Sequence, residues 1–243
     1  MAKRKRNTNQ PNQETQRKEP RPFELRTIKP LTSNQQATFT AYNQGYNLIL
    51  HGYAGTGKTF ISTYLALNDI LNDVDTVYEK MYIVRSAVSS RNIGFLPGGP
   101  SEKNAPYEEP YNEICDDLFG RGDGYRILKA KGIVDFRPTS FLRGITFRNC
   151  VLLVDEIQNM TFQELDTIIT RVGENCRIVF CGDFRQTDFN KATTREESGI
   201  HSFMKILDRM DGFAHVEFDK EDIVRSGLVK SYIINKTELE LTA

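Results

Sequence analysis

The residues of this 243-residue sequence that are best suited to do chemistry lie between Gly52 and Thr59. Gly52 and Gly57 have four residues between them, and Lys58 and Thr59 follow directly. This is the spacing of a phosphate-binding loop, in which consecutive backbone N–H groups surround a polyphosphate. The lysine can reach the β- and γ-phosphates, and the threonine hydroxyl can bind Mg²⁺. The pattern predicts a site for a nucleoside triphosphate and magnesium.

The sequence on either side of this loop supplies the elements that the motif needs. Residues 47–51 form a short apolar run typical of a buried strand, and residues 60–71 have the spacing of an amphipathic helix. A glycine-rich turn that binds nothing is the alternative interpretation. The residues that we expect to contact the nucleotide are Gly52, Ala54, Gly55, Thr56, Gly57, Lys58, Thr59 and Phe60.

Two acids follow a second apolar run. Residues 151–154 suit a central parallel strand, and Asp155 and Glu156 come directly after it. A carboxylate at the tip of a strand beside a phosphate loop can hold Mg²⁺ through water, which is the role expected of Asp155. Glu156 is placed to orient and deprotonate an attacking water, so the pair indicates hydrolysis. A strand that ends in solvated acids is the alternative.

A third buried strand, predicted at residues 177–181, leads into a polar segment that starts with Gly182 and Asp183. Open α/β sheets bind ligands at the carboxyl ends of their strands, so a polar side chain here would face the γ-phosphate. Gln186 is the candidate, as a sensor that distinguishes triphosphate from diphosphate. Because Gly-Asp is also an ordinary strand-to-loop turn, a purely structural role stays open.

Two further polar residues lie far from the loop in the sequence. Gln35 follows an N-cap predicted at Thr32 or Ser33, and a glutamine upstream of the first strand can hydrogen-bond the edge of adenine. An ordinary N-terminal cap helix is the alternative. Arg225 lies near the start of a final helix predicted over residues 219–235, where it can form an ion pair or reach a triphosphate. From spacing alone, the ion pair is favoured.

The alternation of strands and helices predicts an α/β fold with a mostly parallel central sheet. A capping box at residues 161–164 marks the start of one of the helices. The other elements expected are strands at residues 80–84, 133–136 and around 216–218, and helices at 106–119, 125–131 and 198–210.

Charge is distributed unevenly along the chain. Residues 1–29 hold nine Lys/Arg and three Glu, a net charge of +6, whereas the remainder carries −6. We predict that residues 1–28 form a disordered basic tail and that residues 29–243 form one domain. The tail can contact nucleic acid or another anionic surface, or it can simply aid solubility.

The four cysteines form no CxxC pair and no zinc-binding spacing. Cys150 and Cys181 lie in apolar runs, where a buried and reduced thiol is expected. The sequence contains neither a secretory signal nor a long uncharged apolar run. A cytoplasmic protein without membrane association is therefore expected.

Together these motifs resemble those of the PhoH family, which is named for phosphate starvation. The family consists of ATPases with a single RecA-like domain, similar to the first motor domain of superfamily 1 helicases. The resemblance implies a three-layer P-loop fold with a RecA-like sheet. Many ATPases share the phosphate loop and the Asp-Glu pair, whereas segments 94–98 and 222–225 are more specific. The matching segments are 30–35, 52–59, 85–88, 94–98, 106–107, 143–146, 155–159, 182–188 and 222–229.

The resemblance implies roles for single residues. Gln35 would read adenine, Gln186 would sense the γ-phosphate, and Arg225 would be an arginine finger acting on a neighbouring subunit. A homo-oligomeric ring, with the hexamer as a candidate size, and a link to RNA are implied as well. The chain departs from the family pattern at Ser86, which replaces a proline, at Arg91, which replaces an acid, and after Arg225, where Ser-Gly replaces His-Pro.

The leading functional prediction is ATP hydrolysis with Mg²⁺, coupled to RNA or another single-stranded nucleic acid. One set of motifs makes one RecA-like lobe, so movement along a strand would require an oligomer. Arg85, Arg91, Phe95 and Arg143 are candidate strand contacts, because single-strand sites combine basic and aromatic groups. Two alternatives stay open: a nucleoside kinase similar to thymidine kinase, which usually adds a zinc ribbon, and a non-catalytic, ATP-dependent assembly or switch protein.

Overall fold

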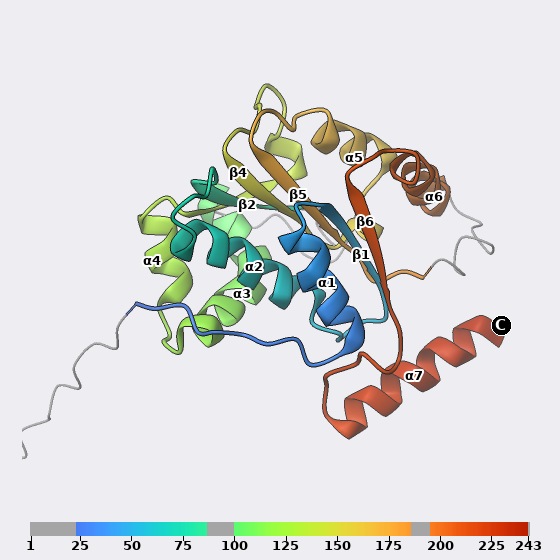
Figure 1. The fold of residues 1–243 in the computed structure, drawn as a ribbon. Coiled ribbons are helices and arrows are strands. Elements are labelled where there is room, and N and C mark those ends of the chain that lie inside the picture. Colours follow the sequence, from blue (N-terminus) through green and yellow to red (C-terminus); the bar gives the residue numbers. More distant parts are fainter. Residues whose placement is uncertain (1–22, 87–99, 186–194, 243) are drawn as a thin grey trace, which may run out of the picture.

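The computed structural model describes residues 23–86, 100–185 and 195–242. Within these residues the core is a six-stranded sheet of order β3-β2-β4-β5-β1-β6, in which every neighbouring pair is parallel (Figure 1). The predicted α/β fold with a parallel central sheet is confirmed. The strands are β1 (Asn47–Gly52), β2 (Lys80–Arg85), β3 (Val134–Pro138), β4 (Cys150–Val154), β5 (Cys176–Cys181) and β6 (Phe213–Phe218).

The central strands are buried on both faces, which explains their nearly continuous apolar sequences. Successive side chains of a strand point to opposite faces of the sheet. Leu50 and Leu153 belong to the apolar cluster on one face, whereas their neighbours Ile49 and Leu152 belong to the cluster on the other. Because both faces need apolar side chains, residues 48–50 of β1 and all of β4 form apolar runs rather than alternating patterns.

Helices cover both faces of the sheet and complete the three layers (Figure 1). Residues of the first four helices contribute to one apolar cluster, and residues of the fifth and sixth contribute to the other. None of the described helices combines the length and apolar character needed to cross a membrane. The helices are α1 (Ser33–Asn43), α2 (Lys58–Asn72), α3 (Pro100–Phe119), α4 (Gly124–Ala130), α5 (Phe162–Ile169) and α6 (Arg195–Leu207), with short 3₁₀ turns at Thr139–Phe141 and Ile157–Asn159.

The start of α3 differs from the prediction, which placed it at Pro106. The helix begins at Pro100 and runs through both Pro106 and Pro110. A proline inside a helix removes one backbone hydrogen bond, so a proline in a sequence favours a first-turn position. Tyr111 and Leu118 of the same helix are fully buried, and this packing offsets the lost bonds.

The last helix also differs from the prediction of residues 219–235. Helix α7 spans Gly227–Thr242, and a loop precedes it. Short acidic side chains hold this loop: Asp222 accepts hydrogen bonds from the Asn34 amide (2.7 Å) and the Asp219 backbone N–H (2.9 Å). Such local bonds compete with helix formation. As a result, Arg225 lies in the loop rather than on the helix.

The folded part of the chain starts earlier than the predicted boundary at residue 29. Phe23 stacks on Phe119 with ring centroids 4.3 Å apart, and the Arg26 backbone N–H donates to the Leu118 carbonyl (2.9 Å). Residues 23–28 therefore pack against α3 rather than belonging to the predicted tail. The rest of that tail, residues 1–22, lies outside the described residues.

The carboxyl ends of all the strands meet at one edge of the sheet, because the strands are parallel. The phosphate loop follows β1, the Asp155–Glu156 pair follows β4, and Asp183 follows β5. Since β5 lies between β4 and β1, Asp183 is placed between the acids and the loop. Strand order thus brings together three segments that are far apart in the sequence.

Candidate nucleotide-binding site

The phosphate loop has the backbone conformation that its glycines predict. Gly55 and Gly57 have φ angles of +73° and +84°, a region that other residues rarely adopt. Gly57 caps helix α2, which begins at Lys58 and whose first N–H groups face the loop. A helix N-terminus with free N–H groups favours phosphate. The loop and α2 together can bind a polyphosphate.

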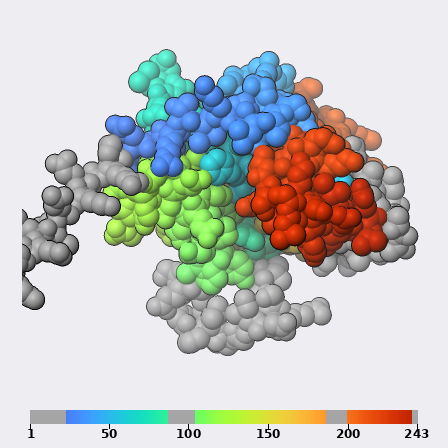
Figure 2. Space-filling view, turned by 90° about the horizontal axis from the view of Figure 1, so that it is seen from below, coloured from blue at the N-terminus to red at the C-terminus, as the bar shows by residue number. Residues whose placement is uncertain are grey.

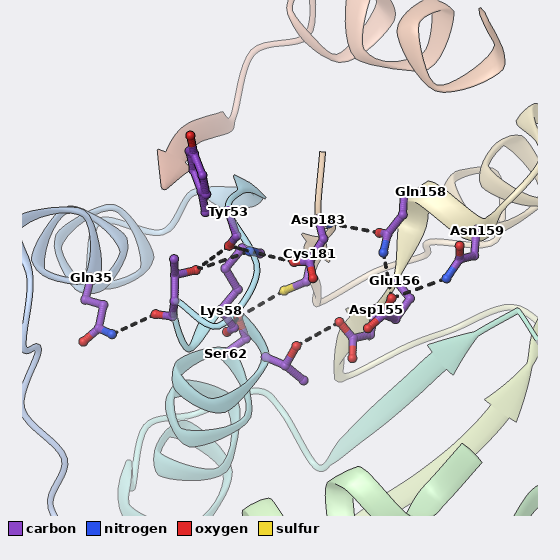
Figure 3. A network of polar contacts seen from close by, with 12 residues as sticks. Gln35, Tyr53, Lys58, Ser62, Asp155, Glu156, Gln158, Asn159, Cys181 and Asp183 are labelled. Carbon is purple, nitrogen blue, oxygen red and sulfur yellow. Dashed lines mark hydrogen bonds and ion pairs between the residues drawn. The ribbon is translucent and has the colours of Figure 1, made fainter. Parts of the chain in front are cut away.

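Lys58 points into the curve of the loop and is only 5% exposed. Its Nζ donates to the Tyr53 carbonyl oxygen (2.6 Å) and lies 2.8 Å from Oδ1 of Asp183 (Figure 3). The carboxylate of Asp183 therefore neutralises the lysine at the place where a phosphate oxygen is expected. Sequence reasoning gave Asp183 no role, because its contact with Lys58 depends on the order of the strands.

Thr59 and Asp155 lie together as predicted. The Thr59 hydroxyl donates to Oδ1 of Asp155 (2.9 Å), and the Tyr111 hydroxyl donates to Oδ2 (2.8 Å). Burial raises the pKa of Asp155, and the two hydrogen bonds oppose this rise. A hydroxyl beside a carboxylate fits Mg²⁺, which takes oxygen ligands and keeps positions for water and phosphate. The residues present can therefore hold this ion.

Glu156 has an unusual backbone conformation, with φ 57° and ψ 43°. Its Oε2 accepts hydrogen bonds from the side-chain amides of Gln158 (2.7 Å) and Asn159 (3.3 Å), as Figure 3 shows. Burial raises the pKa of Glu156, and the nearby charges of Asp155 and Asp183 raise it further. Left-handed backbone in a non-glycine residue is strained and is found preferentially at functional sites. The side chain is held at the pocket as a base would need to be.

Gln158 and Asn159 were part of a matching motif but had no predicted role. The side-chain oxygen of Gln158 accepts the Asp183 backbone N–H (3.0 Å), while its amide nitrogen donates to Glu156. The two ends of this one amide thus connect the tips of β4 and β5. Two amide residues shortly after the acidic pair were the available sequence signal.

Gln35 contacts the phosphate loop directly. It is 3% exposed, and its Nε2 donates to the Thr56 carbonyl oxygen (2.9 Å) while its Oε1 accepts the Leu31 backbone N–H (2.8 Å). A primary amide has a second N–H and a second lone pair, so Gln35 keeps one donor and one acceptor for a base edge. The structure brings Gln35 to the pocket, and its reading of adenine stays a prediction.

Arg225 lies against the phosphate loop of its own chain. The backbone N–H of Val224 donates to the Gly55 carbonyl oxygen (3.1 Å), and a Cβ atom added at Gly55 would lie 2.9 Å from the Arg225 Cγ. Among the described residues, no acid lies within 4.0 Å of the guanidinium. The ion pair that spacing favoured is therefore not found in the described part of the chain. A neighbouring subunit is not needed to bring Arg225 to a pocket.

One pocket with a volume of about 600 Å³ lies between these elements, within the usual range for a small-molecule site. Its lining includes Gln35, Lys58, Thr59, Asp155, Glu156, Asp183 and Arg225. Figure 2 looks onto its mouth, where α2 is visible in a hollow between the N-terminal segment, α3 and α7. Gln186, Arg91 and Phe95 lie outside the described residues. Lining residues that sequence reasoning did not assign to the nucleotide site include Ile28, Arg85, Pro110, Glu113 and Ile114.

The unassigned lining residues divide into two kinds. Arg85 is the last residue of β2, which pairs with β4. Its place at the carboxyl end of a strand, like that of Asp155, was a sequence signal that could have assigned it to the site. Pro110 and Ile114 come from α3, and nothing in their residue types indicates a ligand. Only the packing of α3 beside α2 places them at the pocket.

Comparison with known proteins agrees with this fold. A protein-family model described as "PhoH-like protein" matches residues 27–236. The fold is similar to that of the large terminase from a thermophilic bacteriophage, a structure in complex with ADP, with a TM-score of 0.50 and 14% identity. That match covers 84% of this chain and 49% of the terminase chain, and it shows the fold alone.

Curated relatives match over most of this chain. The PhoH-like protein of Bacillus subtilis (strain 168) is 30% identical over 209 residues, which are 86% of this chain and 63% of the relative. Protein PhoH of Escherichia coli (strain K12) is 33% identical over 179 residues, which are 73% of this chain and 49% of the relative. The chain thus spans about half to two thirds of their length. On the strength of the family match, which spans residues 27–236, the chain belongs to the PhoH family.

Proposed function

We propose that this protein hydrolyses ATP with the help of Mg²⁺. The observation that carries the proposal is the arrangement of Thr59, Asp155 and Glu156 at one pocket: a hydroxyl–carboxylate pair suited to the ion, next to a second carboxylate held by two amides. A protein that only binds nucleotide needs the first carboxylate but not the second. Family membership agrees with a nucleotide-dependent protein.

Each residue has a defined part in the proposed reaction. The loop N–H groups and Lys58 bind the β- and γ-phosphates, and a phosphate oxygen replaces the Asp183 carboxylate beside Lys58. Thr59 and Asp155 hold the ion, which when bound offsets charge on the phosphate oxygens. Glu156 takes a proton from water, whose oxygen bonds to the γ-phosphorus while the bond to the bridging oxygen breaks. The products are ADP and phosphate.

The nucleobase and γ-phosphate contacts belong to the same proposal. Gln35 would select adenine with its remaining donor and acceptor. Its hydrogen bond to the Thr56 carbonyl oxygen also ties the adenine contact to the phosphate loop. Gln186 would sense the γ-phosphate; it follows β5 by five positions in the sequence and lies outside the described residues. Arg225 would stabilise the charge that grows on the phosphate oxygens, in the pocket of its own chain.

Replacing Arg225 with alanine should lower turnover about 10²-fold while leaving ATP affinity nearly unchanged, because the guanidinium acts mainly on charge in the transition state. Steady-state turnover and equilibrium ATP binding measure the two effects. Arg126→Ala, which removes an exposed arginine from α4, is the control. Mixing Arg225→Ala chains with Glu156→Gln chains should restore no activity, since each pocket then lacks one group. Recovery in the mixture would instead show that Arg225 acts on a neighbour.

We further propose that hydrolysis is coupled to RNA or another single-stranded nucleic acid, in a homo-oligomer. The resemblance to RNA-linked ATPases supports the coupling. The exposed apolar side chains Leu228, Tyr232 and Leu239 support an oligomer, because their spacing places them on one face of α7. Arg143 is exposed and stays a candidate strand contact, whereas Arg85 lines the nucleotide pocket. The expected cytoplasmic location stays a prediction.

The test is ATP turnover of the purified chain with and without single-stranded RNA, with single-stranded DNA and duplex RNA as comparison arms. Turnover that rises with single-stranded RNA is the expected result. Transfer of the γ-phosphate to added thymidine would identify a nucleoside kinase instead. Nucleotide-dependent assembly without turnover would identify a switch protein. An absence of ATP binding would contradict the whole proposal.

A further inference from the structure

The carboxylate of Asp155 is bound on both oxygens by hydroxyl groups from two different helices. Thr59 on α2 donates to Oδ1, and Tyr111 on α3 donates to Oδ2 at 2.8 Å. Tyr111 is fully buried and Asp155 is 6% exposed. Among the described residues, Tyr111 is the only side chain bonded to the second oxygen. The hydroxyl of Tyr111 therefore fixes the plane of a carboxylate that Thr59 alone would leave free to rotate.

The hydrogen bond from Tyr111 replaces a bond to water that Asp155 loses on burial. A carboxylate removed from water loses several hydrogen bonds, and an unpaired buried acceptor is costly. A group that hydrogen-bonds a metal-binding side chain on the side away from the metal orients that side chain and changes its affinity for the metal. Tyr111 is in that position, because Thr59 occupies the oxygen on the phosphate-loop side.

We propose that Tyr111 is a positioning residue for Mg²⁺: its hydroxyl holds Asp155 in the orientation in which the carboxylate and the Thr59 hydroxyl bind the ion together. The inference rests on the proposed function. It also gives α3 a part in the site, since the same helix places Pro110 and Ile114 on the wall of the nucleotide pocket.

The competing explanation is that Tyr111 only fills the core. Its ring lies 6.1 Å from the ring of Phe136 on β3, so the aromatic body contributes to packing. Tyr111→Phe keeps this ring and removes only the hydroxyl. Tyr125→Phe is a closely matched control: Tyr125 is 3% exposed, and its hydroxyl donates to the carboxylate of Glu108, also at 2.8 Å. That pair does not line the nucleotide pocket.

The experiment compares metal binding with nucleotide binding in the full chain. Mn²⁺ affinity of the ATP-loaded protein is measured by electron paramagnetic resonance, and ATP affinity is measured separately in EDTA. Tyr111→Phe should weaken Mn²⁺ binding about tenfold, as substitutions behind a metal ligand typically do, and should leave ATP affinity in EDTA unchanged. Raising the Mg²⁺ concentration should restore its turnover. Tyr125→Phe should match the wild type in both affinities.

Three results would overturn the inference. The first is wild-type Mn²⁺ affinity in Tyr111→Phe. The second is an equal loss in Tyr111→Phe of Mn²⁺ affinity and of ATP affinity in EDTA, which would mean general disruption of the fold. The third is an equal loss of Mn²⁺ affinity in Tyr125→Phe. If the wild-type protein itself binds no Mn²⁺ with ATP, the proposed function fails, and this outcome is distinct from a failure of the Tyr111 role alone.

Discussion

Replacing Glu156 with glutamine should leave ATP bound and lower its hydrolysis about 10³-fold, which is the scale of a general base. Glutamine has the same shape and can still accept a hydrogen bond from Gln158, but it cannot take a proton from water. The strained backbone at residue 156 is unchanged by the substitution, so the pocket should keep its form. Single-turnover hydrolysis and equilibrium binding of ATP, measured on the same preparation, separate the two effects.

A second half-buried acid provides the control for this substitution. Glu164 caps α5 and accepts hydrogen bonds from Ser86 (3.0 Å) and from the Thr161 backbone N–H (2.9 Å). It lies outside the nucleotide pocket, so Glu164→Gln should keep measurable turnover even if it lowers the free energy of unfolding. A normal rate in Glu156→Gln would assign the base to another residue and leave the nucleotide site itself intact.

Replacing Lys58 with alanine should weaken ATP binding about 10³-fold, since contacts between buried charges contribute about 2–5 kcal/mol. The ammonium group is almost fully buried in the loop, where it holds the Tyr53 carbonyl and the Asp183 carboxylate. Without it, the loop has no positive charge to oppose Asp183, and that carboxylate then repels the phosphates as well. Turnover at any accessible ATP concentration should be lost with the binding.

The control for Lys58→Ala is another lysine in an ion pair. Lys129 lies 2.6 Å from Glu108 on the α3–α4 side of the molecule, away from the pocket. Lys129→Ala should leave ATP affinity unchanged, and thermal unfolding of both variants checks that the fold persists. Unchanged ATP affinity in a folded Lys58→Ala protein would contradict the assignment of the phosphate loop.

Much of the fold could be predicted because its signals are local. The strands β1 and β4 are buried on both faces, so their apolar runs are clear, and residues 52–59 have the spacing of a phosphate-binding loop between a strand and a helix. The capping box of α5 forms as expected, with Thr161 and Glu164 bonding each other's backbone N–H groups. Thr59 and Asp155 could be paired in advance because the two motifs assign both side chains to the same Mg²⁺ ion.

What could not be predicted depends on contacts between distant segments. Ile223 and Val224 continue the apolar spacing of α7 toward its N-terminus, which predicts a longer helix. In the structure Asp222 accepts a hydrogen bond from Asn34, and the segment before Gly227 is a loop. Tyr111 has no local signal, since its partner Asp155 lies 44 positions away. The placement of Arg225 in its own pocket follows from the bond between Val224 and Gly55, which no sequence pattern encodes.

The bond between Asn34 and Asp222 joins residues that are 188 positions apart. The ribosome must therefore synthesise nearly the whole domain before the wall of the pocket that Val224 and Arg225 form can pack against the phosphate loop. By that point the six strands have all been made, and the sheet can form first. Premature termination shortly after β6 would yield a chain with its sheet and phosphate loop but without this wall. Completion of the nucleotide pocket is thus tied to completed translation of the segment around residue 225.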